Sequence, residues 1–100
     1  MMSRHIVMDR QQVEAFCRKH HIRRLSLFGS VLGNDFGPDS DVDVLVEFAP
    51  GHVPGLQFFE MERELSNILG RNVDLNTPEF LSPYFRDEVL AAAEDQYVAS

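Results

Sequence analysis

The stretch LFGSVLGNDFGPDSDVDVLVEF, residues 27–48, decides the fold of this 100-residue chain. A Gly-Ser pair ends one apolar segment, and Asp41 and Asp43 stand at the head of the next one. Successive side chains of a strand point to opposite faces, so these two carboxylates share one face while the intervening valines take the other. The segment 41–48 is therefore predicted to be a strand that packs its valines on a core and keeps Asp41 and Asp43 on one side.

Helix and strand patterns continue on both sides of this stretch. Apolar residues at three-to-four spacing follow Asp9, a predicted N-cap, and a second such run ends at Gly70, a predicted C-cap. Ser82 and Pro83 mark the start of a last helix. The predicted elements are helices over 9–20, 30–36, the run ending at Gly70 and 82–98, with strands over 22–28, 41–48 and 71–77. This order predicts an α/β (α+β) fold, a small mixed β-sheet packed by helices, with residues 1–100 as a single domain.

Composition narrows the class of protein. The net charge is -7, so direct binding to a nucleic-acid backbone is unfavourable. The basic run RKHHIRR, residues 18–24, is either a phosphate-binding strip or, in the interpretation we favour, the polar end of a helix.

No apolar run is long enough to span a membrane, the first residues lack a signal-peptide pattern, and Cys17 is the single cysteine. We expect a cytoplasmic protein with no membrane segment and with Cys17 in its core.

Asp41 and Asp43 carry the first chemical hypothesis. Two ionised carboxylates held close together repel each other unless a proton or cation intervenes, and Mg²⁺ is a hard dication that prefers such oxygen ligands. A calcium loop is excluded because its glycine and glutamate positions are occupied by Val44 and Pro50. The alternative is structural: Asp41 caps a turn, and Asp43 faces solvent on a half-exposed sheet.

Gly29-Ser30 and Asp74 extend the candidate site. A glycine lets the backbone approach a ligand closely, and a serine at the start of a helix stands where N–H groups suit phosphate oxygens. The alternative for Gly29 and Ser30 is an ordinary turn between a strand and a helix. Asp74 is the one acid on the third predicted strand, where alternation places it on the polar face as a metal ligand, a base or a solvent-facing residue.

These features form a compound motif: Gly29-Ser30, a gap of nine residues, then Ser40-Asp41-x-Asp43 and an apolar strand. The motif resembles the signature of the DNA polymerase beta-like nucleotidyltransferase superfamily, most closely its minimal nucleotidyltransferase branch. The segments LFGS, DSDVDVLVEF and VDLNTPEFLSPYFRDEVL carry the resemblance, which covers most of the chain from residue 25 to residue 90.

The resemblance implies the nucleotidyltransferase fold and a Mg²⁺-dependent enzyme. Such an enzyme moves a nucleoside monophosphate from a nucleoside triphosphate onto a hydroxyl and releases pyrophosphate. Gly29 and Ser30 would hold the triphosphate, and Ser40 would donate one more hydrogen bond. Two Mg²⁺ ions would be bound by the three aspartates Asp41, Asp43 and Asp74. Members of this branch are commonly antitoxins that inactivate a HEPN-domain toxin by moving AMP from ATP to a tyrosine, so such a toxin is the expected partner.

One segment departs from a frequent form of the family, in which a basic residue follows the Gly-Ser pair within a few positions. Residues 31–35 read VLGND and contain none. Arg23, Arg24 or the partner protein are the candidate sources of positive charge.

A second hypothesis is an antitoxin that acts by binding alone, and a partner could cover the apolar residues Tyr84, Phe85 and Tyr97. A third, transfer to RNA or to an aminoglycoside-like hydroxyl, is disfavoured because we identify no separate acceptor-binding domain.

Overall fold

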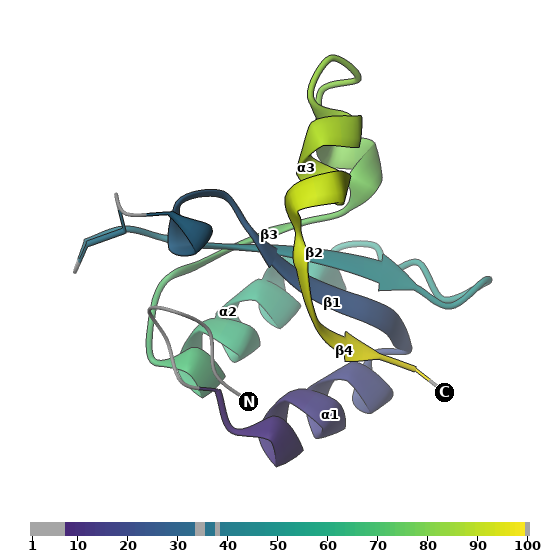
Figure 1. Cartoon of the computed structure of the whole chain (residues 1–100). Coiled ribbons are helices and arrows are strands. Elements are labelled where there is room, and N and C mark those ends of the chain that lie inside the picture. Colours follow the sequence, from purple (N-terminus) through teal and green to yellow (C-terminus); the bar gives the residue numbers. More distant parts are fainter. Residues whose placement is uncertain (1–7, 34–35, 38, 100) are drawn as a thin grey trace.

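A computed structural model describes residues 8–33, 36–37 and 39–99 of the chain (Figure 1). Its helices are α1 (Arg10–Lys19), α2 (Gln57–Leu69) and α3 (Arg86–Ala92), with 3₁₀ turns η1 (Gly29–Leu32) and η2 (Pro78–Phe80). Its strands are β1 (Ile22–Phe28), β2 (Val42–Phe48), β3 (Val73–Asn76) and β4 (Glu94–Val98). The short helix predicted over 30–36 corresponds to η1, and residues 34 and 35 of that prediction lie outside the described residues.

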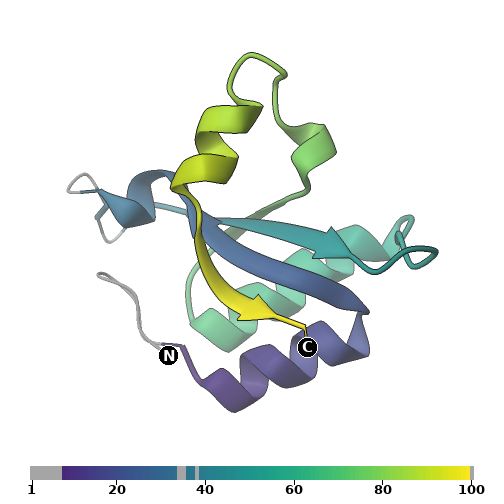
Figure 2. The ribbon, with the colours of Figure 1, turned by 45° about the vertical axis from the view of Figure 1, so that its right-hand side comes forward.

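The strands form a mixed sheet in the order β3-β2-β1-β4. β1 is antiparallel to β2 and to β4, whereas β2 and β3 are parallel. Figures 1 and 2 show α1 and α2 on one face of the sheet, and α3 on the other face. We call the face that carries Asp43, Leu45 and Glu47 of β2 the open face. The predicted architecture, a small mixed sheet packed by helices, is confirmed.

The core lies between the sheet and the helices α1 and α2. Val42, Val44 and Val46 of β2 are fully buried in one cluster with Phe16 of α1 and Leu65 of α2. Burial of an apolar side chain of this size stabilises the fold by roughly 1.5 to 3 kcal/mol. The alternation predicted for the second strand is therefore present, and it directs the odd-numbered side chains of β2 to the open face.

The helix ends and the cysteine follow the sequence predictions. Asp9 Oδ1 accepts hydrogen bonds from the N–H groups of Gln11 and Gln12 at 2.9 and 3.3 Å, which caps α1. Gly70 ends α2 with a φ of 68°. Cys17 is buried, and burial raises the pKa of its thiol to about 12. No helix in the described part of the chain is long and apolar enough to cross a membrane.

Helix α2 also holds the edge strand β3 in place. Glu62 Oε2 accepts a hydrogen bond from the Leu75 N–H at 2.8 Å, and Ser66 Oγ accepts one from the Val73 N–H at 3.0 Å. An edge strand presents unpaired backbone N–H groups, which these two side chains satisfy. The position of Asp74, which lies between Val73 and Leu75, is thereby fixed from both sides.

The prediction of one continuous helix over 82–98 is wrong. α3 begins at Arg86 rather than at Pro83, and it ends at Ala92. The last residues form β4, which pairs antiparallel with β1 and packs Tyr97 against the core. The alanines and acids of this segment favour a helix locally, but pairing with β1 satisfies the backbone groups of an otherwise free sheet edge. The third strand is also shorter than the predicted 71–77.

Candidate active site

Asp43 belongs to β2, the strand between β1 and β3, and its side chain lies on the open face of the sheet. Its register partners are Phe28 on antiparallel β1 and Asp74 on parallel β3. Burial raises the pKa of the Asp43 carboxyl, and the charges of Asp74 and Asp41 and a hydrogen bond with Asp74 raise it further. This position concentrates negative charge that a proton or a cation would relieve.

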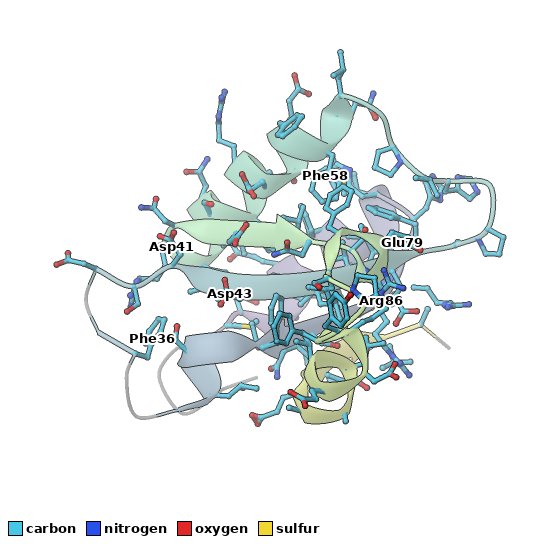
Figure 3. All side chains as sticks on the ribbon, turned by 90° about the horizontal axis from the view of Figure 1, so that it is seen from above. Phe36, Asp41, Asp43, Phe58, Glu79 and Arg86 are labelled. Atoms are coloured by element: carbon cyan, nitrogen blue, oxygen red, sulfur yellow. The ribbon has the colours of Figure 1, made fainter. Side chains whose placement is uncertain are left out.

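Asp41 and Asp74 are exposed to solvent, whereas Asp43 is half-buried. Asp41 precedes the first residue of β2, and Figure 3 shows it at the start of that strand with Asp43 farther along. Within residues 8–33, 36–37 and 39–99, no three His, Cys, Asp or Glu side chains are grouped closely enough to hold one metal ion. The structure thus pairs Asp43 with Asp74 and leaves Asp41 at the rim, from which its carboxylate would have to turn inward to complete a ligand set.

Gly29 makes room for Asp43. It follows β1 with a φ of 75°, in the left-handed region that strains residues other than glycine. A Cβ atom at position 29 would overlap Asp43 Oδ2 and would lie 3.2 Å from Asp43 Cγ. The Gly-Ser turn and the aspartate strand therefore form a single structure, in which a side chain at position 29 would displace the Asp43 carboxylate.

The two serines of the predicted site lie in turns. Ser30 follows Gly29 in η1, where its carbonyl oxygen accepts a hydrogen bond from the Gly33 N–H at 3.0 Å. Ser40 Oγ accepts a hydrogen bond from the Gly37 N–H at 3.0 Å and closes the turn that leads into β2. A bond from the Ser40 hydroxyl to a ligand would therefore be additional to this structural role.

Arg71 fixes the turn before Asp41, although it is not among the residues predicted from the sequence. Its Nη2 donates hydrogen bonds to the carbonyl oxygens of Gly37 and Ser40 at 2.7 and 2.9 Å. The Arg71 guanidinium also lies over the ring of Phe36, 4.5 Å from the ring centroid. Gly37 and Ser40 precede Arg71 by 34 and 31 positions in the sequence. No local sequence pattern could therefore have indicated these two hydrogen bonds.

Arg71→Ala is expected to lower the free energy of unfolding by about 1 to 3 kcal/mol, because two charge-assisted hydrogen bonds and a cation–π contact are lost. Arg71→Lys is expected to recover only part of the loss, since an ammonium lacks the planar fork of a guanidinium. Urea unfolding measures the effect. Arg63→Ala, at an exposed position of α2, is the matched control. Equal unfolding midpoints for Arg71→Ala and Arg63→Ala would contradict the assigned role.

Arg23 and Arg24 do not supply positive charge to the Gly29 turn. Arg23 Nη2 and Arg24 Nη1 lie 3.1 and 3.5 Å from carboxylate oxygens of Glu47. Phe28 is the register partner of Asp43, and Arg24 lies four residues before Phe28 on β1. The backbones of Arg24 and Phe28 are therefore about 13 Å apart along the strand. The two arginines are therefore engaged at the far end of β1, away from the aspartates.

Comparisons with known proteins give a family match and a similar relative. A family profile described as nucleotidyltransferase domain matches residues 9–95. A protein of Methanocaldococcus jannaschii, assigned as a protein adenylyltransferase, is 38% identical over 77 residues, which cover 77% of this chain and 82% of the relative.

Solved structures share the fold. A chain assigned as a minimal nucleotidyltransferase gives a TM-score of 0.69 at 34% identity, over 84% of this chain and 85% of that chain. A toxin-antitoxin structure with AMP-PNP gives 0.72 at 19% identity, over 93% of this chain and 76% of the other. A complex of tri-AMPylated Shewanella oneidensis HEPN toxin with MNT antitoxin gives 0.63 at 20% identity, over 90% of this chain and 70% of the other.

Proposed function

This chain belongs to the family of nucleotidyltransferase domains, and on that premise we propose that it transfers AMP from ATP to a tyrosine hydroxyl of a HEPN toxin. It would act as the antitoxin of the pair. The relative of similar length is assigned as a protein adenylyltransferase, and a structural neighbour is an MNT antitoxin in complex with its AMPylated HEPN toxin.

The contact between Gly29 and Asp43 is the observation that carries the proposal. The backbone of the Gly-Ser turn reaches the Asp43 carboxylate so closely that only a glycine fits. Asp74 stands in register with Asp43 on the next strand. A turn suited to a triphosphate and a pair of carboxylates suited to a cation therefore share one corner of the open face.

The donor set fits Mg²⁺ in its chemistry. Asp41, Asp43 and Asp74 offer carboxylate oxygens, and their mutual repulsion at Asp43 is what a dication relieves. When bound, two Mg²⁺ ions would lower the pKa of the attacking hydroxyl and neutralise charge that develops on the triphosphate. Among the chain's own residues, Gly29 and Ser30 would orient the triphosphate and Asp41 would close the ligand set.

In the transfer step, one bond to the α-phosphorus of ATP forms while another breaks. The tyrosine oxygen attacks the α-phosphorus of ATP as the bond from that phosphorus to the bridging oxygen of the β-phosphate breaks. Pyrophosphate leaves with the electrons of that bond. The exposed carboxylate of Asp74 would accept the hydroxyl proton as a general base.

The direct test is transfer of label from ATP carrying a labelled α-phosphate to the purified toxin in the presence of Mg²⁺. We expect labelled toxin with the native chain and a loss of about a thousandfold in rate with Asp41→Asn, which corresponds to about 4 kcal/mol of lost transition-state stabilisation. Asp39→Asn, an exposed aspartate of the same turn, is the matched control and should retain the native rate. Equal transfer by Asp41→Asn and the native chain would refute the catalytic assignment.

A second candidate function is neutralisation of the toxin by binding alone. It is favoured by one observation: residues 29–43 contain no Lys or Arg to bind the triphosphate. The double variant with Asp41→Asn and Asp43→Asn separates the two functions. If transfer is the function, this variant should still bind the toxin in a pull-down but should fail to protect cells; protection at the native level would establish binding as sufficient.

A further inference from the structure

A polar cavity lies on the open face, farther along β2 from the aspartates. It has a volume of about 300 Å³ and is bounded by the sheet, η2 and α3. Its polar and charged lining comes from Arg24, Ser26, Glu47, Glu79 and Asp95. None of these residues is among the glycine, serines and aspartates of the proposed nucleotide site.

The cavity is next to the proposed site of transfer. Leu45 lines its floor and follows Asp43 by two residues on the same face of β2, which is about 6.5 to 7 Å along the strand. Figure 3 shows Asp41 and Asp43 near the start of β2, and Glu79 and Arg86 farther along. A group bound in the cavity would therefore lie beside an acceptor hydroxyl placed at Asp43 and Asp74.

The cavity is negatively charged. Glu47, Glu79 and Asp95 face a single cation of the lining, Arg24. Arg24 Nε lies 3.7 Å from Asp95 Oδ2, and Arg24 Nη1 lies 3.5 Å from Glu47 Oε2. These contacts leave the third carboxylate, Glu79, as the acid of this cavity that the arginine does not pair.

Glu79 is exposed and has no ion pair within 4 Å among the described residues. Hydrogen bonds from its own backbone N–H and from the Thr77 side chain lower the pKa of its carboxyl, and the charge of Arg86 lowers it further. Arg86 itself donates its hydrogen bonds to the carbonyl oxygens of Pro78 and Leu81. Glu79 is therefore an ionised group held at the mouth of the cavity.

A second cavity of about 390 Å³ continues from the first, and the two share Glu47, Pro78 and Glu79. Its lining is mainly apolar and includes Phe48, Val53 and Phe80. The cation of this lining is Arg23, whose Nη2 lies 3.1 Å from Glu47 Oε1. Val53 and Phe80 are 79% and 64% exposed, and this apolar lining is packed at one edge, where the centroid of the Phe80 ring lies 5.4 Å from that of Phe58. Adjacent exposed apolar residues of this kind are typical of a surface that binds another protein.

We propose that these two cavities bind the acceptor protein beside its reactive tyrosine, with an Arg or Lys of that protein against Glu79 and an apolar side chain against Phe80. This inference rests on the proposed function. The lining repels phosphate, so it does not suit the triphosphate or an RNA backbone. The two linings together carry three acids, Glu47, Glu79 and Asp95, against the two bases Arg23 and Arg24. Because both arginines pair with Glu47 or Asp95, the unpaired charge is that of Glu79, and a cationic side chain is its complement; charge complementarity sets partner choice and association rate.

Steady-state transfer to the toxin by Glu79→Lys tests the proposal. We expect the KM for the toxin to rise about tenfold, with the kcat and the KM for ATP within twofold of native. Glu79→Gln should give a smaller rise in the same direction. Glu60→Gln, on the helix that covers the opposite face, is the matched control and should leave all three constants unchanged.

Tyrosine peptides provide the second arm. The native chain should label peptides with arginine next to the tyrosine at least about tenfold faster than peptides with glutamate there, and Glu79→Lys should reverse that order. An unchanged KM for the toxin with Glu79→Lys, or equal labelling of both peptides, would overturn the proposal while native transfer to the toxin continues. If the native chain labels no acceptor, the proposed function fails, and this inference fails with it.

Discussion

Asp43→Asn is expected to reduce AMP transfer by about a thousandfold or more and, at the same time, to stabilise the metal-free protein at neutral pH. The rate falls because an amide cannot replace the carboxylate that would bind the cation, a loss of about 4 kcal/mol or more in transition-state stabilisation. Stability rises because burial and the charges of Asp74 and Asp41 make ionised Asp43 unfavourable in the folded state.

The pH dependence gives the sign of the stability effect. Since folding raises the pKa of the Asp43 carboxyl, the folded state binds the proton more tightly than the unfolded state. The stabilisation from this proton is fully present below the unfolded pKa and is lost as the pH rises through the folded pKa. Without Mg²⁺, the Tm advantage of Asp43→Asn should therefore be largest at neutral pH and should disappear in acid.

Differential scanning fluorimetry and the labelled-ATP assay measure the two effects on the same samples. Added Mg²⁺ should raise the Tm of the native chain more than that of Asp43→Asn, because the cation relieves a repulsion that the variant lacks. Asp39→Asn should behave as native in both assays. A variant at position 43 that loses activity together with stability would show that Asp43 supports the fold and not a charged site.

Gly29→Ala is expected to remove AMP transfer nearly as completely, by a different cause. The left-handed backbone costs an alanine about 1 to 2 kcal/mol, and its Cβ would in addition overlap Asp43 Oδ2. Either the turn or the carboxylate must move. Because the proposed reaction depends on that carboxylate, we expect a loss of at least about a hundredfold in rate at temperatures where the variant is still folded.

Gly51→Ala is the matched control for this substitution. Gly51 also has a positive φ, 81°, but nothing lies within 4 Å of the Cβ that an alanine would add. It should show the backbone cost in its unfolding midpoint and keep the native transfer rate. If Gly29→Ala and Gly51→Ala lose stability equally and both remain active, the close approach between the turn and Asp43 has no functional consequence.

The predictions that succeeded rest on strong local patterns. The alternation of valines and aspartates fixed which face of β2 is buried, and Gly70 marked the end of α2 because a helix commonly ends on a left-handed residue. The same patterns brought Asp43 and Asp74 to one face, since both strands alternate and pair in parallel register.

The features that local sequence patterns do not predict depend on long-range contacts. β4 consists of residues that continue a helical pattern, and only its pairing with β1 makes it a strand. Arg71 precedes β3 without any motif, and its role comes from carbonyl oxygens of a distant turn. The reason for glycine at position 29 is likewise tertiary, because the atom that would overlap a side chain belongs to Asp43.

The intact mass of the toxin, purified from cells that co-express this chain, tests the central claim most directly. With the native chain, the measured mass of the toxin is expected to exceed its unmodified mass by one or more AMP units. With Asp43→Asn it should have its unmodified mass, and the cells should lose protection. An unmodified toxin in cells that the native chain protects would contradict the account and would establish neutralisation by binding.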